Sequence, residues 1–233
     1  MKSHRISVFL IVLTLLMTVL ASCDDNTVTT AGVSTYDDLV SALSGTDDIV
    51  RLDADINVED TLVVTRAVTL DMNGKTLSNK TEIWDPSANK WSIISVRENG
   101  NLTITGNGKI DALENDCYGT DVTDGGKLVI EDGEITGNIS AVYVLKGSAE
   151  IKGGTYSIKQ LDPNKNYAFT LNARDENYNN KTATITVTGG SFVNFNPAAN
   201  AAESSGDTTN FVAEGYKTTT AEEGGKTIYT VTK

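Results

Sequence analysis

Hydrophobic and polar positions along the chain repeat a short unit. In this unit two apolar residues flank one other, usually polar, residue, and a polar step then leads to a glycine. The five copies occupy residues 68–74, 102–108, 128–133, 149–154 and 185–190. Alternation of apolar and polar residues is typical of a β-strand with one buried face. A unit that returns at intervals of roughly 20–35 residues indicates a stack of repeats.

Two more apolar elements accompany this unit. An alternating stretch precedes several copies, and an apolar residue follows each glycine: Leu77, Ile110, Ile135, Tyr156 and Phe192. Turn-forming residues separate these elements, so each repeat is predicted to form three short strands joined by turns. Stacked repeats would align like residues into interior ladders and parallel sheets. Residues 49–195 resemble the right-handed parallel β-helix of the pectin-lyase-like superfamily, which implies an all-β solenoid but no particular activity.

The two ends of the repeat region carry different patterns. Residues 34–45 predict an amphipathic helix, with Thr35 as its N-cap and apolar residues at helical spacing up to Leu43. Residues 211–233 predict a β-hairpin that turns at Gly224-Gly225. Because the open ends of a solenoid expose apolar surface and strand edges, we expect both elements to act as caps. The sequence thus predicts one domain, residues 34–233, with coils over 49–195.

The first residues are typical of a targeting signal. Residues 1–22 combine a basic start with an apolar run that is somewhat short for a transmembrane helix. Leu20-Ala21-Ser22-Cys23 resembles the lipobox of bacterial lipoproteins, which implies cleavage after residue 22 and lipidation of Cys23. Residues 23–33 would form a flexible tether. We expect a protein anchored by lipid in the bacterial cell envelope, at the outer membrane or cell surface in preference to the inner membrane.

Charge and residue usage exclude several functions. The net charge is −12, and a signal peptide ending at residue 22 would remove Lys2 and Arg5 but no acidic residue. Nucleic acid is therefore not an expected partner. The single histidine is His4, which excludes imidazole-based triads and histidine-ligated zinc from the domain. It also departs from the pectin-hydrolysing enzymes of the resembled superfamily, whose sites include a histidine. With Cys23 lipidated, Cys117 has no disulfide partner and is expected to be buried.

Acidic residues cluster between two repeats. They are Asp111, Glu114, Asp116, Asp121 and Asp124. One interpretation is a structural calcium site, the only cofactor that the sequence suggests. Another is the carboxylate and calcium site of a polysaccharide lyase or hydrolase. The third is a solvated acidic face that keeps the sheets soluble, since the spacing matches neither an EF-hand nor a glycine-rich calcium repeat.

Aromatic residues interrupt the repeat at four candidate binding positions: Trp84, Trp91, Tyr118 and Tyr178, all expected in loops. Aromatic rings present flat apolar faces suited to sugar rings or to a protein partner. The alternative is that both tryptophans fold back over the flank of the repeat domain. The sequence therefore predicts a non-enzymatic, membrane-anchored binding or adhesion module for a glycan or a surface protein. A polysaccharide lyase or hydrolase is the alternative.

Overall fold

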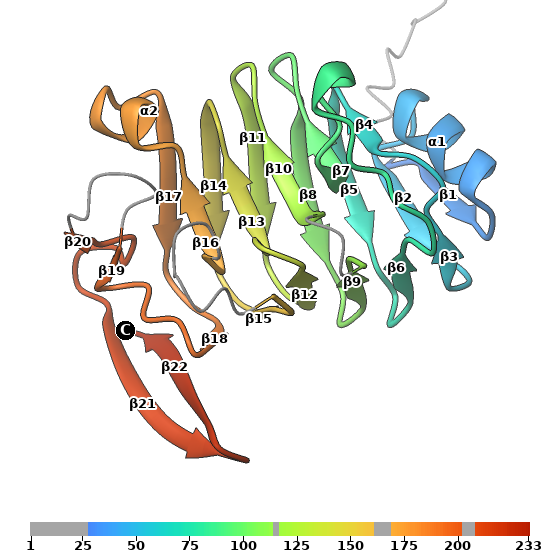
Figure 1. Ribbon diagram of the computed structural model, residues 1–233. Coiled ribbons are helices and arrows are strands. Elements are labelled where there is room, and N and C mark those ends of the chain that lie inside the picture. The colour runs from blue at the N-terminus through green and yellow to red at the C-terminus, as the bar shows by residue number, and fades with distance from the viewer. Residues whose placement is uncertain (1–27, 114–116, 161–168, 202–207) are drawn as a thin grey trace, which may run out of the picture.

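The computed structural model describes residues 28–113, 117–160, 169–201 and 208–233. These residues form an all-β structure with three large sheets of mostly parallel strands and two short helices (Figure 1). This confirms the all-β part of the predicted fold class. The stacked parallel sheets are compatible with a β-helix-like fold.

Each large sheet runs along the length of the molecule. The seven-stranded sheet contains β1 (Thr30–Val33), β2 (Ile49–Leu52), β5 (Ala67–Asp71), β8 (Asn101–Thr105), β11 (Gly126–Ile130), β14 (Gly147–Ile151) and β17 (Ala183–Val187). The five-stranded sheet contains β4 (Leu62–Val64), β7 (Ser92–Val96), β10 (Tyr118–Val122), β13 (Val142–Val144) and β16 (Leu171–Ala173). The eight-stranded sheet contains β3 (Ile56–Asn57), β6 (Thr76–Ser78), β9 (Lys109–Asp111), β12 (Glu134–Gly137), β15 (Thr155–Ile158), β18 (Ser191–Val193), β22 (Lys226–Thr232) and β21 (Lys217–Glu223).

From β4 to β18 the chain visits the three sheets in a fixed rotation, so consecutive strands of one sheet lie three strands apart in sequence. Within this span all pairing inside the three sheets is parallel. Parallel strands usually need crossover helices, but here strands of the other two sheets provide the connection. The rotation explains why the sequence repeat has three apolar elements.

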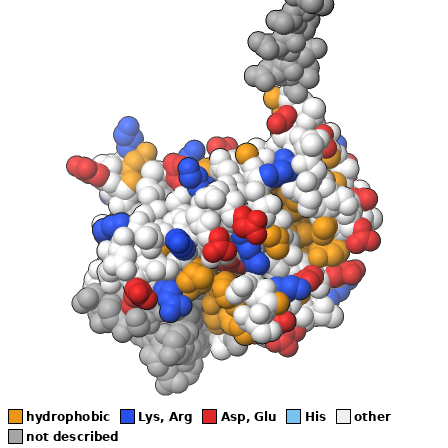
Figure 2. Space-filling model, turned by 90° about the horizontal axis from the view of Figure 1, so that it is seen from above, with side chains coloured by type: hydrophobic (Ala, Val, Ile, Leu, Met, Phe, Trp, Pro, Cys, Tyr) orange, Lys and Arg blue, Asp and Glu red, His pale blue; other side chains and the backbone are white. Residues whose placement is uncertain are grey.

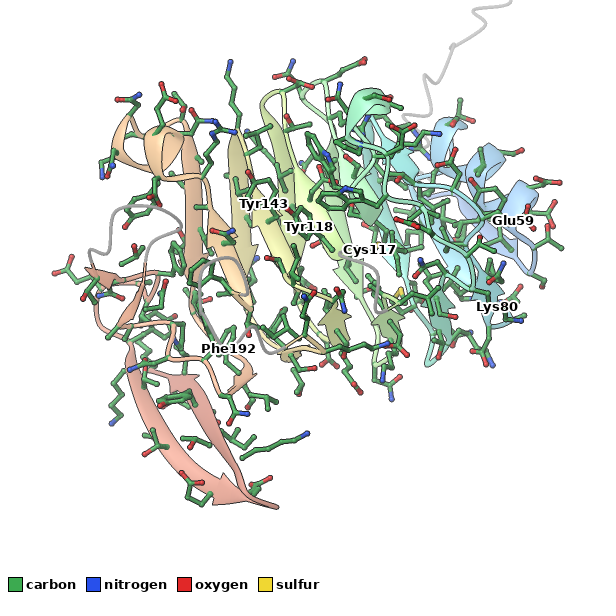
Figure 3. The ribbon with its side chains drawn as sticks, viewed as in Figure 1. Glu59, Lys80, Cys117, Tyr118, Tyr143 and Phe192 are labelled. Carbon is green, nitrogen blue, oxygen red and sulfur yellow. The ribbon has the colours of Figure 1, made fainter. Side chains whose placement is uncertain are left out.

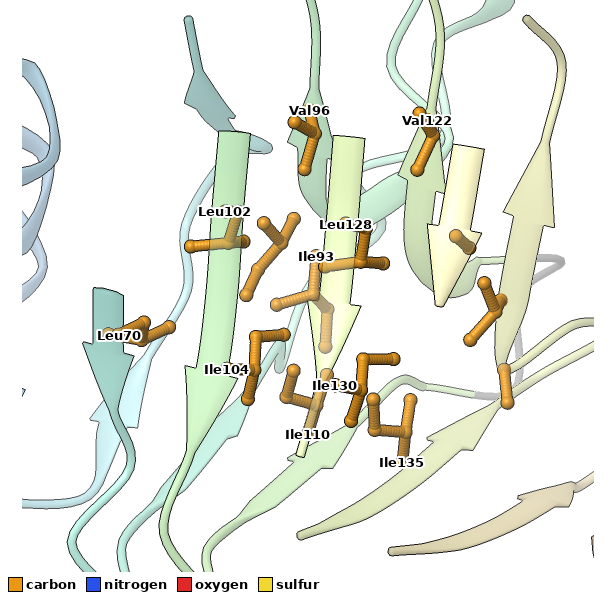
Figure 4. Packing of buried hydrophobic residues seen from close by; sticks show 14 of the residues in the cluster. Leu70, Ile93, Val96, Leu102, Ile104, Ile110, Val122, Leu128, Ile130 and Ile135 are labelled. Atoms are coloured by element: carbon orange, nitrogen blue, oxygen red, sulfur yellow. The ribbon is translucent and has the colours of Figure 1, made fainter. Parts of the chain in front are cut away.

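The register aligns like residues into buried ladders. In the seven-stranded sheet one ladder joins Leu70, Ile104, Ile130, Ile151 and Val187, all at most 1 % exposed. Its members Leu70, Ile104 and Ile130 are seen in Figure 4. In the eight-stranded sheet the predicted inward residues form a second ladder: Leu77, Ile110, Ile135, Tyr156 and Phe192. Burial of these side chains is the main contribution to the stability of the stack. The predicted interior ladders are confirmed.

A glycine of the repeat lies at a corner where the coils approach closely. Gly154 has a φ of +89°, and a Cβ atom there would lie 2.5 Å from the carbonyl oxygen of Gly133 in the preceding coil. Both the backbone angle and the close approach require glycine at this position.

Two elements flank the parallel strands. Helix α1 (Tyr36–Ser44) begins after Thr35, whose hydroxyl accepts a hydrogen bond from the Asp38 backbone N–H as predicted. Leu39 and Leu43 of α1 are buried, and Arg66 donates to the carbonyl oxygens of Ala42 and Leu43. At the other end β21 and β22 form the predicted hairpin, and β22 pairs antiparallel with β18. The hairpin extends away from the stacked sheets (Figure 1).

The remaining elements are short. They are the 3₁₀ helix η1 (Pro86–Ala88), helix α2 (Asp175–Asn179), and the strand pair β19 (Asn200–Ala201) and β20 (Thr208–Thr209). Three sequence expectations are wrong. Residues 30–33 of the expected tether form β1, which pairs with β2. Tyr178 lies on helix α2 and not in a loop. Tyr118 lies on strand β10 and not in a loop. Its segment, Tyr-Gly-Thr-Asp-Val, lacks apolar alternation, so the pattern concealed a strand of the five-stranded sheet.

Candidate ligand-binding site on the five-stranded sheet

The outer face of the five-stranded sheet is covered. In each strand two residues point into the core. The residue between them points outward, because side chains alternate between the two faces of a strand. The register aligns these outward residues in one row: Val63, Ser95, Asp121, Tyr143 and Asn172. Val63 on the edge strand is 40 % exposed, whereas the other members are at most 7 % exposed. A layer outside the sheet must therefore cover Ser95, Asp121, Tyr143 and Asn172.

Three aromatic side chains, Trp84, Tyr118 and Tyr143, form a continuous strip on this face. The ring of Trp84 meets that of Tyr118 edge to face, with 5.4 Å between centroids and an angle of 87°. Tyr118 contacts Tyr143 of the adjacent strand at 5.0 Å, and the two tyrosines lie side by side in Figure 3. Trp84 and Tyr118 are half-buried, and Tyr143 is buried. This aromatic strip provides an apolar surface with phenol and indole groups at its edge.

Asp121 lies in the row next to the strip and is completely buried. Its Oδ2 accepts a hydrogen bond from the Ser95 hydroxyl at 2.8 Å, and its Oδ1 contacts the Ser92 hydroxyl. The Ser95 hydroxyl in turn accepts from Arg97 Nε at 2.6 Å. Burial raises the pKa of Asp121 from 3.8 to about 6, and the two serines and Arg97 oppose that rise only partly.

The covering layer includes residues 79–91, which connect β6 to β7 and carry both tryptophans of the chain. We call them the 79–91 segment. Its tip is a closed turn, because Asp85 and Lys90 exchange backbone hydrogen bonds and the Asp85 side chain caps η1. Lys90 pairs with Asp60, and the Asn89 carbonyl oxygen accepts a hydrogen bond from Arg97. The segment is thereby attached to the same arginine that reaches Asp121 through Ser95.

The acidic candidates are dispersed as far as the structure describes them. Asp111 lies on β9 in the eight-stranded sheet, 2.9 Å from the Lys159 ammonium group. Asp124 is exposed in the turn after β10, whereas Asp121 is buried within that strand. Glu114 and Asp116 lie outside the described residues. Within the described part of the chain, no group of three or more acidic, cysteine or histidine residues could hold a metal ion.

The other candidates have separate surroundings. Trp91 is half-buried beside the aromatic strip, and its carbonyl oxygen accepts a hydrogen bond from the Tyr118 backbone N–H at 2.7 Å. Tyr178 lies on α2, where its ring packs against Phe211 at 5.9 Å and under the Lys181 ammonium group. Cys117 is buried as predicted, and burial raises the pKa of its thiol to about 12. Cys23 lies outside the described residues.

Sequence reasoning missed Tyr143, Ser92, Ser95 and Arg97 as members of this site. A signal for Tyr143 exists in the triplet Val142-Tyr143-Val144, where two inward valines leave the tyrosine outward. Ser95 stands in the same way between Ile94 and Val96. No sequence signal connects Arg97 to Asp121, because Ser95 joins them only after two strands have paired.

No family model, curated protein or solved structure matches the chain. Among the described residues, no helix has the length and apolar character that crossing a membrane requires. Acidic and basic side chains of the described residues are interspersed on the face seen in Figure 2. Since no known protein matches, the site is interpreted from its own chemistry.

Proposed function

We propose that the chain is a non-enzymatic binding module of the bacterial cell envelope, anchored by lipid at Cys23 after removal of residues 1–22. Its three sheets would be the faces of a right-handed parallel β-helix, with α1 and the β21–β22 hairpin as caps. The cyclic order of the strands supports the β-helix, and the lipobox-like sequence supports the anchor.

The ligand we propose is a glycan, bound at the aromatic strip. The observation that carries this proposal is the contact of Trp84 with Tyr118 and of Tyr118 with Tyr143 across two neighbouring strands and a loop. Sugar rings stack on aromatic faces, and their hydroxyl groups bond to polar groups at the edge. Trp84 and Tyr118 are half-buried and would offer the sugar its contact surface, while the buried Tyr143 supports Tyr118 from the adjacent strand.

The charges beside the strip favour a neutral glycan over an acidic one. Arg97 is bonded to Ser95 and Asn89, and Lys90 is paired with Asp60. An acidic sugar would have to compete with these partners for a cation, on a chain with a net charge of −12.

An enzyme of the lyase or hydrolase class would need several converging carboxylates. Asp121, the acid of this face that lies by Arg97, is completely buried.

Tryptophan fluorescence provides a direct binding test, because Trp84 and Trp91 are the only tryptophans of the chain. The full-length chain is titrated with neutral and acidic polysaccharides, with and without calcium. We expect a saturable change with a neutral glycan, and Trp84→Ala to weaken binding at least about fivefold, since stacking on an aromatic ring contributes about 1 kcal/mol or more. Calorimetry measures this affinity independently of the lost fluorophore.

Tyr178→Phe is the matched control, because it changes an aromatic residue that packs on Phe211 and not on the strip. It should bind like the unmodified chain. Equal affinity of Trp84→Ala and the unmodified chain would exclude the strip as the site. The appearance of reducing or unsaturated sugar ends would show that the protein is an enzyme and not a binding module. Binding of protein partners but of no glycan would show that the ligand is a protein.

A further inference from the structure

The hydrogen atoms around Asp121 can be placed uniquely if the carboxyl is neutral. The Ser92 hydroxyl lies 2.8 Å from the Ile94 carbonyl oxygen and also contacts Asp121 Oδ1. A hydroxyl has one hydrogen, so it cannot donate to both oxygens. A proton on Oδ1 resolves the conflict: Asp121 donates to Ser92, and Ser92 donates to Ile94.

The other carboxyl oxygen is equally well satisfied. Arg97 Nε donates to the Ser95 hydroxyl, and Ser95 donates to Oδ2, which needs no proton. The hydroxyl hydrogens of Asp121, Ser92 and Ser95 then have one acceptor each. Because an ionised Asp121 would leave Ser92 with two competing acceptors in a fully buried site, the covered geometry fits the neutral acid.

We propose that the 79–91 segment is an acid-closed cover of the five-stranded sheet, which lies over Asp121 when this residue is protonated and loosens when it ionises. The proton is exchanged with solvent. The connection runs from Asp121 through Ser95 to Arg97, and from Arg97 to the Asn89 carbonyl oxygen in the segment.

The direction follows from linkage between proton binding and closure. Burial raises the pKa of Asp121 from 3.8 to about 6, so the covered state binds the proton more tightly than a solvated state would. Acidification therefore favours closure. If opening restores the ordinary pKa, the closing equilibrium is about tenfold more favourable at pH 5 than at pH 8.

We assign the transition near pH 6 to Asp121 after considering the charged and titratable groups around it. Arg97 faces it from the end of β7, Cys117 and Asp124 from the two ends of β10, and Tyr143 from β13. Burial raises the pKa of Cys117 to about 12, far above this range. In the segment, hydrogen bonds lower the pKa of Asp85 and raise that of Lys90, which moves both away from pH 6. The only histidine of the chain is His4.

For ligand binding, the inference rests on the proposed function. Closure brings Trp84 against Tyr118 and completes the aromatic strip, so glycan affinity should be higher at pH 5 than at pH 8. The closure itself requires no ligand and can be measured without one.

Acrylamide quenching of tryptophan fluorescence tests the cover, because both tryptophans belong to the segment and acrylamide is neutral. For the full-length chain without ligand we expect the quenching constant to rise from pH 5 to pH 8 with a midpoint near 6. In Asp121→Asn the amide can donate to Ser92 and accept from Ser95 like the protonated acid. This variant should show low quenching at both pH values.

Two further variants complete the test. Asp124→Asn is the matched control, because asparagine suits the φ of +51° at this exposed turn, and it should keep the transition. Ser95→Ala breaks the connection between Asp121 and Arg97, so its quenching should no longer change near pH 6. This variant keeps the test valid if Asp121→Asn fails to fold. A flat profile of the unmodified chain, or an unchanged transition in Asp121→Asn, would overturn the inference. A normal transition without glycan binding would refute only the proposed function.

Discussion

Two parallel sheets of this molecule have the same connectivity but different outer faces. In the seven-stranded sheet the outward residues Thr103, Glu150 and Thr186 reach solvent at least in part. In the five-stranded sheet the outward residues Ser95, Asp121, Tyr143 and Asn172 are buried. An exposed outer face needs only polar residues, whereas a covered one must satisfy each polar group or place it beside an aromatic ring.

The difference indicates where the chain departed from its repeat. A regular coil requires inward ladders but leaves the outward positions free. The five-stranded sheet uses those positions for Ser95, Asp121 and Tyr143, and the 79–91 segment supplies Asn89 and Trp84 to the layer above. A buried carboxylic acid costs stability when it ionises, so stability alone does not explain Asp121 at this place.

The largest expected effect is the loss of an outward aromatic residue under the cover. Tyr143→Ala should lower the free energy of unfolding by about 3–5 kcal/mol, as for a core aromatic residue, because the side chain is only 7 % exposed. Thr103→Ala, at the outward position of the seven-stranded sheet, should change it by at most about 0.5 kcal/mol. Urea unfolding measures both. Equal and small changes would mean that the two outer faces do not differ in burial.

The inner faces could be predicted from the sequence far better than the outer ones. The ladder through Leu77, Ile110 and Ile135 follows from spacing, because stacking equivalent coils places equivalent residues in register. Strand β10 was missed because Thr120 occupies an inward position where its neighbours have Ile94 and Val142. In that strand the register with neighbouring coils decided the structure, and its own apolar pattern did not.

The site was predicted only in part for a related reason. Trp84 and Tyr118 were candidates as aromatic residues, but their contact joins a loop to a strand that the sequence did not reveal. Asp121 was grouped with Asp111 and Asp124 by proximity in sequence. The fold instead places Asp111 on another sheet and Asp124 in an exposed turn. Asp121 is connected through Ser95 and Arg97 to Asn89, which lies 32 residues earlier in the chain, and no local pattern encodes such a connection.

A middle-sized effect concerns the pH dependence of unfolding. The pKa of Asp121 is raised in the folded state, so the native protein binds this proton more tightly than the unfolded chain and loses stability as pH rises through about 6. Between pH 5 and pH 8 this residue should lower the free energy of unfolding by about 1.4 kcal/mol. Urea titrations at both pH values measure the change.

Asp121→Asn should remove this contribution, whereas Asp124→Asn should retain it. Asp121 lies on the covered sheet, so its titration tests whether the two outer faces differ in electrostatics. Tyr143→Ala tests whether they differ in packing. The same pH dependence in Asp121→Asn as in the unmodified chain would assign it to other groups and leave the covered row without an electrostatic role.

The smallest expected effect comes from the ion pair between Lys90 of the 79–91 segment and Asp60. Lys90 and Asp60 are 35 % and 45 % exposed, so Lys90→Ala should change the urea midpoint only slightly. Lys109→Ala is the matched control, since it removes a comparably exposed pair with Glu134, at 3.0 Å, on the eight-stranded sheet. The two variants should unfold at similar urea concentrations but differ in acrylamide quenching, because Lys90, unlike Lys109, belongs to the segment that carries both tryptophans. Similar increases in quenching would show that the tryptophans respond to net charge, and the cover would then have no specific attachment to lose.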